Sequence, residues 1–173
     1  MPSTTVHLTR RFFGSLRPGG PKRADEEWAR AQLLPSEVEL WQRMRGADRR
    51  HAVGVAREVE RALGAEATRP VLAAALLHDV GKIESGLGIY GRVIATLCGM
   101  IAGRETAKEW TRTRGFTRRV GLYLLHPDLG GDLLGMAGSD PLTETWTREH
   151  HRSPESWTID PEIAAALKAA DDD

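Results

Sequence analysis

The sequence predicts an all-α fold of roughly seven to nine helices. After residue 24, apolar residues recur at spacings of three and four, the period of an amphipathic helix. Alternating β-branched patterns, which are typical of strands, are absent from the sequence. The chain has 173 residues, of which 40% are hydrophobic, so it can bury the core of one domain. We therefore expect a basic arm over residues 1–23 and one helical domain over residues 24–173.

The arm contains five basic residues and no acidic residue. Proline and glycine interrupt it at residues 17–21, which disfavours a continuous helix. We expect Phe12, Phe13 and Leu16 to pack against the domain, and contact with a phosphate-rich partner is the alternative. His7 is expected to be structural. The basic residues are Arg10, Arg11, Arg17, Lys22 and Arg23.

The first helices of the domain follow directly. Acidic residues from Asp25 onward are typical of the first turn of a helix, and a second helix is expected to begin at Ser36, after Pro35. Residues 47–63 form an amphipathic pattern that ends at a glycine. Residues 71–80 are almost all apolar, which predicts a buried central helix.

The second half of the chain predicts further helices. Residues 89–101 form another apolar helix, in which Cys98 is expected to pack in the core. Proline after His126 separates two helical segments, because it disfavours a helical residue before it. Trp110, Trp146 and Trp157 are expected in the core. The remaining predicted helices are 116–125, 127–136, 141–151 and 161–170.

Composition excludes several classes of protein. The 24 basic residues balance the 24 acidic residues, so the chain as a whole is not attracted to nucleic acid or to an acidic membrane. No apolar run reaches the length of about 18 residues that a transmembrane helix needs, and the first residues lack the apolar core of a secretory signal. A single cysteine excludes an internal disulfide and a thiolate zinc site. We expect a cytoplasmic protein without a membrane or nucleic-acid partner.

Histidines and aspartates are the candidate functional residues. His78 and Asp79 lie at the end of the most apolar predicted helix. Burying an ionised aspartate there costs on the order of several kcal/mol unless a cation or hydrogen bonds compensate. Histidine is the commonest transition-metal side-chain ligand, and a metal ion would supply the compensation. The pair therefore predicts a metal site.

Five elements of the sequence resemble the HD-domain metal-dependent phosphohydrolases. The central one is the stretch Leu76 to Lys82, which contains the His-Asp pair. The Gly-Tyr-Pro element that names the HD-GYP branch is absent, which argues against cleavage of a cyclic dinucleotide. The other matching elements are His51 after two arginines, His126–Pro127 with Gly130, the pair His150–His151, and Asp171 after two alanines.

The resemblance implies a helical HD domain that hydrolyses a phosphomonoester or phosphodiester, with a nucleotide as the expected substrate. A metal-activated hydroxide would attack phosphorus. Manganese, iron, nickel or cobalt would suit such ligands. The resemblance implies a first metal held by His51, His78, Asp79 and Asp171, and a second held by Asp79, His126, His150 and His151.

Further roles and alternatives remain open at this point. Lys82 would act as a catalytic residue beside Asp79 by holding phosphate or helping the leaving group, or it could cap a helix end.

Consecutive histidines diverge by about 100° on a helix, so both can reach one metal only at a distorted helix end or with one of them outside the ligand shell. The alternatives are a mononuclear phosphohydrolase, in which the later histidines bind phosphate, and a non-catalytic module that binds metal and nucleotide.

A group of arginines lies in the middle third of the chain. Guanidinium groups bind phosphate in a bidentate manner, but these arginines could equally form a solvated face with Glu105 and Glu109. The group comprises Arg92, Arg104, Arg112, Arg114, Arg118 and Arg119.

Overall fold

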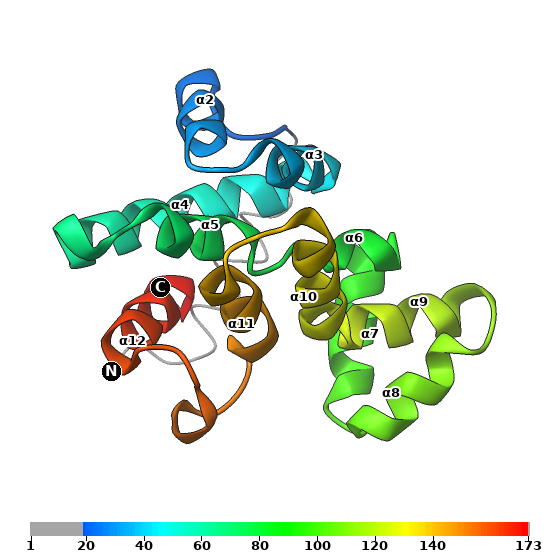
Figure 1. The fold of residues 1–173 in the computed structure, drawn as a ribbon. Coiled ribbons are helices and arrows are strands. Elements are labelled where there is room, and N and C mark those ends of the chain that lie inside the picture. Colours follow the sequence, from blue (N-terminus) through cyan, green and yellow to red (C-terminus); the bar gives the residue numbers. More distant parts are fainter. Residues whose placement is uncertain (1–18, 173) are drawn as a thin grey trace.

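A computed structural model describes residues 19–172 as a helical assembly without strands (Figure 1). The all-α prediction is confirmed, and the helices are close in number to the seven to nine expected. Residues 1–18, which hold most of the predicted arm and His7, lie outside the described residues, as does Asp173. The helices are α2 (Arg23–Ala31), α3 (Pro35–Arg43), α4 (Gly46–Leu63), α5 (Arg69–Leu77), α6 (Lys82–Ser85), α7 (Ile89–Gly99), α8 (Arg104–Thr111), α9 (Gly115–Leu124), α10 (His126–Ala137), α11 (Pro141–Glu149) and α12 (Pro161–Asp172), with short 3-10 turns at Gly64–Glu66 and Pro154–Ser156.

The centre of the fold is α5, which packs against α4 and α11 (Figure 1). Every residue from Val71 to Leu77 is buried, as the apolar sequence predicts. Helix α12 covers the other side of α4, and α10 packs on α11. None of the described helices is both long and apolar enough to cross a bilayer.

The first two helices are fastened to α4 by a shared carboxylate. Glu26 Oε1 accepts hydrogen bonds from Trp41 Nε1 at 2.9 Å and from Arg49 at 3.0 Å. The indole of Trp41 is fully buried. Because Arg49 lies two residues before His51, this network also fixes the start of the helix that carries His51.

Helices α7, α8 and α9 form a separate lobe at the right of Figure 1. This lobe has its own small core, in which Leu87, Ala95 and Val120 are buried. Cys98 and Trp110 are partly buried against it, in agreement with their predicted core positions. Most of the other buried apolar side chains, including Trp146, belong to one larger core around α5.

The central helix ends earlier than the sequence predicts. It stops at Leu77, and residues 78–81 form a turn before α6 begins at Lys82. The backbone here changes to hydrogen bonds from i to i−3, from Val80 to Leu77 and from Lys82 to Asp79. His78 and Asp79 lie in this turn, where their donor atoms are close to those of His126 on α10 and Asp171 on α12.

Candidate metal centre

The seven predicted metal ligands converge on one place in the interior. They come from α4, the end of α5, the start of α10, the end of α11 and the end of α12. Five of them are nearly inaccessible to solvent, at 5% exposure or less. The two more exposed residues are His51 and His151. The buried five are His78, Asp79, His126, His150 and Asp171.

Three of the histidines are oriented by the same kind of local hydrogen bond. Each histidine follows the last turn of a helix (α5, α9 or α11), and its Nδ1 donates a hydrogen bond to the carbonyl three residues earlier. The partners are Ala75 for His78 at 2.9 Å, Tyr123 for His126 at 2.7 Å, and Thr147 for His150 at 2.8 Å. In the neutral ring, a carbonyl partner assigns the proton to Nδ1 and leaves Nε2 with its lone pair.

The three Nε2 atoms are buried and have no hydrogen-bond partner among the described residues. Buried polar nitrogens in native proteins are almost always paired. The same arrangement, with Nδ1 bound to a carbonyl and Nε2 directed inward, is the usual second-shell support of a metal-binding histidine. The donor set therefore fits a metal ion of the kind that imidazole and carboxylate bind.

The first donor group contains His51, His78 and Asp79, whose ligand atoms lie within 4.8 Å of one another. Asp171 completes it from α12. Its Oδ1 lies 2.9 Å from His51 Nε2 and 3.6 Å from His78 Nε2. The neighbouring Asp172 instead pairs with Lys168 on the surface, so the structure selects Asp171 from the terminal acids.

The second donor group contains Asp79, His126, His150 and His151, again within 4.8 Å of one another. Asp79 Oδ1 lies 3.3 Å from His126 Nε2 and 3.7 Å from His150 Nε2. Helix α11 stops at Glu149, so His150 is its C-cap and His151 lies in the following turn. His150 keeps helical dihedral angles, yet the two rings lie close together, with centroids 4.0 Å apart, and both belong to the group.

Asp79 is common to both groups and is ionised. Burial alone would raise the pKa of its carboxyl, but the charges of Lys82 and His78 outweigh burial and hold this pKa well below its usual range. Lys82 Nζ forms an ion pair with Asp79 Oδ2. The expected proximity of the two residues is thus present, although a turn rather than a continuing helix creates it.

The histidines divide by their pKa. Burial would lower the pKa of His78, but Asp79 and Asp171 outweigh burial and raise it to about 9. Burial lowers the pKa of His126 to about 4, and burial together with its histidine neighbours lowers the pKa of His151 to about 2. Burial also lowers the pKa of His150. The three histidines of the second group are therefore neutral at pH 7, the form in which imidazole binds a metal.

Close backbone packing brings the two groups together. A Cβ on Gly81 would lie 2.0 Å from the carbonyl oxygen of His126 and 2.6 Å from the amide nitrogen of Gly130. A Cβ on Gly130 would lie 2.8 Å from the Thr147 methyl group. The turn after Asp79 therefore touches the backbone of α10 directly, and only glycine allows this approach.

One supporting residue was not identified from the sequence. Glu149 is 3% exposed and accepts hydrogen bonds from the amide and the hydroxyl of Thr158, at 2.8 and 2.9 Å. It fixes the turn that follows His151. The sequence offered no signal for this role, because Glu149 lies among other charged residues.

The arginines of the middle third are dispersed. Arg92 binds Asp48 with two hydrogen bonds, at 2.6 and 2.8 Å, and so joins α7 to α4. Arg104 pairs with Asp128, and Arg112 pairs with Glu109. Arg119 donates to the carbonyls of Ser85 and Gly86. Most of these guanidinium groups therefore already have protein partners.

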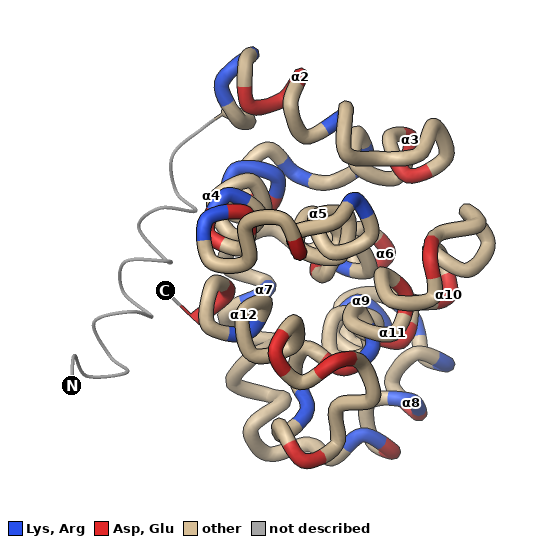
Figure 2. The backbone as a smooth tube through the Cα atoms, turned by 60° about the vertical axis from the view of Figure 1, so that its left-hand side comes forward, with Lys and Arg blue, Asp and Glu red and all other residues tan. Residues whose placement is uncertain are grey.

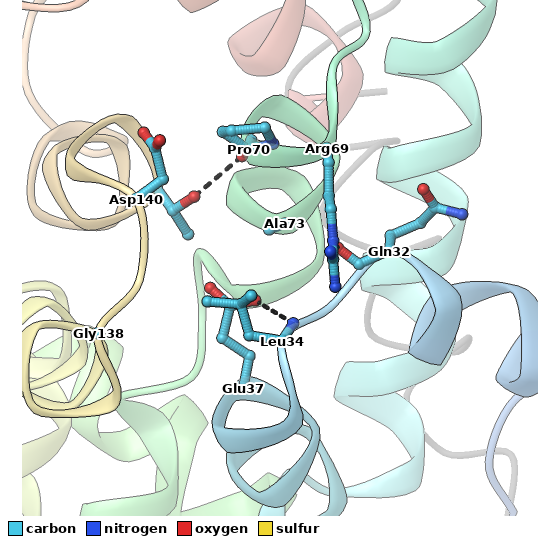
Figure 3. Close-up of a pocket in the computed structure, with 9 residues that line it drawn as sticks. Gln32, Leu34, Glu37, Arg69, Pro70, Ala73, Gly138 and Asp140 are labelled. Carbon is cyan, nitrogen blue, oxygen red and sulfur yellow. Dashed lines mark hydrogen bonds between the residues drawn. The ribbon is translucent and has the colours of Figure 1, made fainter.

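A depression of about 260 Å³ lies away from the donor groups, between α3, α5 and the start of α11 (Figure 3). Its polar groups bind one another, since Glu37 accepts from the Leu34 amide and Thr143 donates to the Pro70 carbonyl. None of the seven predicted ligands lines it. We assign it no function.

No protein-family model, curated protein or solved structure matches the chain. The arguments for its function therefore depend on the residues of the site.

Proposed function

We propose that this chain is a metal-dependent phosphohydrolase of the HD type that acts on a phosphomonoester or phosphodiester, with a nucleotide as the substrate class. The observation that supports this most is the set of three buried Nε2 atoms that lie 3.3–3.7 Å from the carboxylate of Asp79 and have no hydrogen-bond partner among the described residues. Two donor groups that share a carboxylate match the ligand order that the sequence resemblance implies. We propose manganese, iron, nickel or cobalt as the resident ion, in one or two copies.

Under this proposal the residues have distinct roles. His51, His78, Asp79 and Asp171 would hold one ion, and His126, His150 and His151 would hold a second with Asp79. Bound divalent ions would supply Lewis acidity and activation of water toward phosphorus. His51 and His151 are the most accessible ligands, so we expect substrate to approach past these two rings.

Lys82 would contribute positive charge at the site. Its ammonium group already contacts Asp79, and burial in this position is compensated by that carboxylate, which raises the pKa of Lys82. The group therefore stays charged at neutral pH. We propose that it binds a phosphate oxygen of the substrate or stabilises charge on the leaving group.

The test is elemental analysis of the full chain purified without chelator, followed by a phosphoester panel on the same sample. The panel should contain aryl phosphomonoesters, aryl phosphodiesters and nucleoside mono-, di- and triphosphates. About two ions per chain with hydrolysis support the dinuclear reading, and about one ion with hydrolysis supports the mononuclear alternative. Bound metal and nucleotide without turnover would support the non-catalytic module instead.

A matched pair of variants shows whether the bound ion occupies this site. Asp171→Asn removes a buried carboxylate that contacts two histidines, whereas Asp172→Asn changes the exposed neighbour that pairs with Lys168. We expect the first variant to lose about one ion and most hydrolysis, and the second to match the wild type. Equal metal content in both variants would contradict the assignment.

A further inference from the structure

Helix α7 is packed with its large side chains outward. Only Ala95 of this helix is fully buried, and Gly91 and Gly99 approach Leu87 and Leu124 closely. Six large apolar side chains on and just after α7 are instead exposed. We call them the apolar stripe: Tyr90 (76% exposed), Val93 (41%), Ile94 (47%), Leu97 (57%), Met100 (80%) and Ile101 (92%).

The stripe follows the helical period, with steps of three, four and seven residues from Tyr90. Its members therefore lie along one side of the helix. Phe116, at the start of α9, adds another exposed ring to the same lobe. A contiguous exposed apolar surface of this kind marks an interaction site.

The lobe that carries the stripe is basic. Residues 89–119 contain seven basic residues and two acidic ones, although the whole chain is balanced at 24 each. The side chains of Arg114 and Arg118 are exposed and, within the part of the chain that the structure describes, form no ion pair or hydrogen bond. Figure 2 shows basic positions on α9 and both basic and acidic positions on α8. The charge of the chain is therefore separated in space, and its zero net charge does not describe this lobe.

We propose that the apolar stripe docks on the surface of an anionic phospholipid bilayer, with the arginines of the lobe close to the headgroups. Aliphatic and tyrosine side chains enter the headgroup boundary, and basic residues beside them gain from anionic lipid. No described helix can span a bilayer, so the lobe would lie on the surface. This departs from the sequence expectation of no membrane partner, which was based on the charge of the whole chain and on the absence of a long apolar run.

Charge favours an anionic bilayer over the other partners that could cover the apolar stripe. A second copy paired through α7 would place two basic lobes side by side, with repulsion between them. The segment before Gly19 is also basic and contains no acidic residue, so it is a poor match for the same lobe. Nucleic acid offers no apolar surface for six aliphatic and aromatic side chains. An anionic bilayer satisfies both the charge and the apolar stripe.

The experiment is co-sedimentation of the full chain with vesicles of phosphatidylcholine alone and of phosphatidylcholine with phosphatidylglycerol. Leu97→Glu and Ile101→Glu place a charge in the stripe. Met136→Glu is the matched control, because Met136 is 78% exposed but lies on α10, outside the lobe. All three positions are exposed, and thermal unfolding would verify that the variants remain folded.

We expect binding to the anionic vesicles that falls with added salt, about tenfold or more weaker for each stripe variant and unchanged for Met136→Glu. Lack of wild-type binding, equal binding to neutral vesicles, or stripe variants that bind like the wild type would each overturn the proposal. A wild-type dimer that Leu97→Glu converts to a monomer, without vesicle binding, would assign the stripe to a second copy instead. Phosphoester hydrolysis is not a readout here, so the result is independent of the proposed function.

Discussion

Replacement of Gly81 by alanine tests how the two donor groups are held together. The added Cβ would lie 2.0 Å from the His126 carbonyl oxygen and 2.6 Å from the Gly130 nitrogen, where real Cβ contacts are essentially never shorter than 3.0 Å. Both opposing atoms belong to the backbone, so no side-chain rotation relieves the overlap. The turn and α10 must separate by about 1 Å.

This separation has a specific consequence for the site. Metal–ligand distances tolerate changes of only about 0.2 Å. His126 is the first residue of α10, so it would move with the helix, whereas His51, His78 and Asp171 do not belong to α10. We expect Gly81→Ala to lose the ion of the second donor group and to retain more of the first.

The expected loss of stability follows from overpacking against rigid neighbours, which costs about 2–3 kcal/mol. For a chain of this size, that loss lowers the Tm by about 4–12 °C. The measurement is thermal unfolding combined with elemental analysis of the same samples. Gly54→Ala is the matched control, because a Cβ at Gly54 in α4 meets nothing within 4 Å, and an alanine in an exposed helix position stabilises by up to about 1 kcal/mol. A Gly81→Ala protein with wild-type Tm and metal content would refute this account of the packing.

Three further predictions address the site and its support. His126→Ala should leave about one ion per chain and remove most hydrolysis, and full activity in this variant would exclude a catalytic second ion. Manganese at about 100 times its Kd should raise the Tm of metal-free protein by about 5–11 °C, since binding to the folded state alone contributes about 2.7 kcal/mol, and Asp79→Ala should abolish the rise. Glu26→Ala removes the acceptor for Trp41 and should lower the free energy of unfolding by about 1–2 kcal/mol, as urea titration would measure, whereas alanine at the exposed Glu27 should change it little.

Much of the fold follows from local patterns. The spacing of apolar residues predicts α4, α5, α9 and α10 because each buries one side or all of its surface. Helix α8 is missing from that prediction, since it buries only Ala107 and the rest of it is polar. The end of α5 was placed too late because residues 78–80 contain neither the proline nor the glycine that would mark the end of a helix in the sequence.

The site, too, has residues that the local sequence predicts and residues that depend on tertiary contacts. His78 and Asp79 are recognisable because a charged pair at the end of an apolar helix needs compensation. The choice of Asp171 over Asp172 depended on family resemblance, and the structure separates them only through tertiary contacts with α4 and α5. The outward orientation of α7 could not be predicted, because an apolar helix has the same sequence signature whether a neighbour covers it or not.

The hydrogen bonds that orient three of the histidines have a consequence for the affinity of the site for a metal ion. Each of the rings of His78, His126 and His150 is fixed by the carbonyl three residues earlier, near the end of α5, α9 or α11, so its rotamer is selected when these helix ends form. The conformational entropy of these side chains is therefore lost during folding and not during capture of an ion. The donor atoms form a preorganised cage, and loaded and metal-free protein should have nearly the same side-chain conformations.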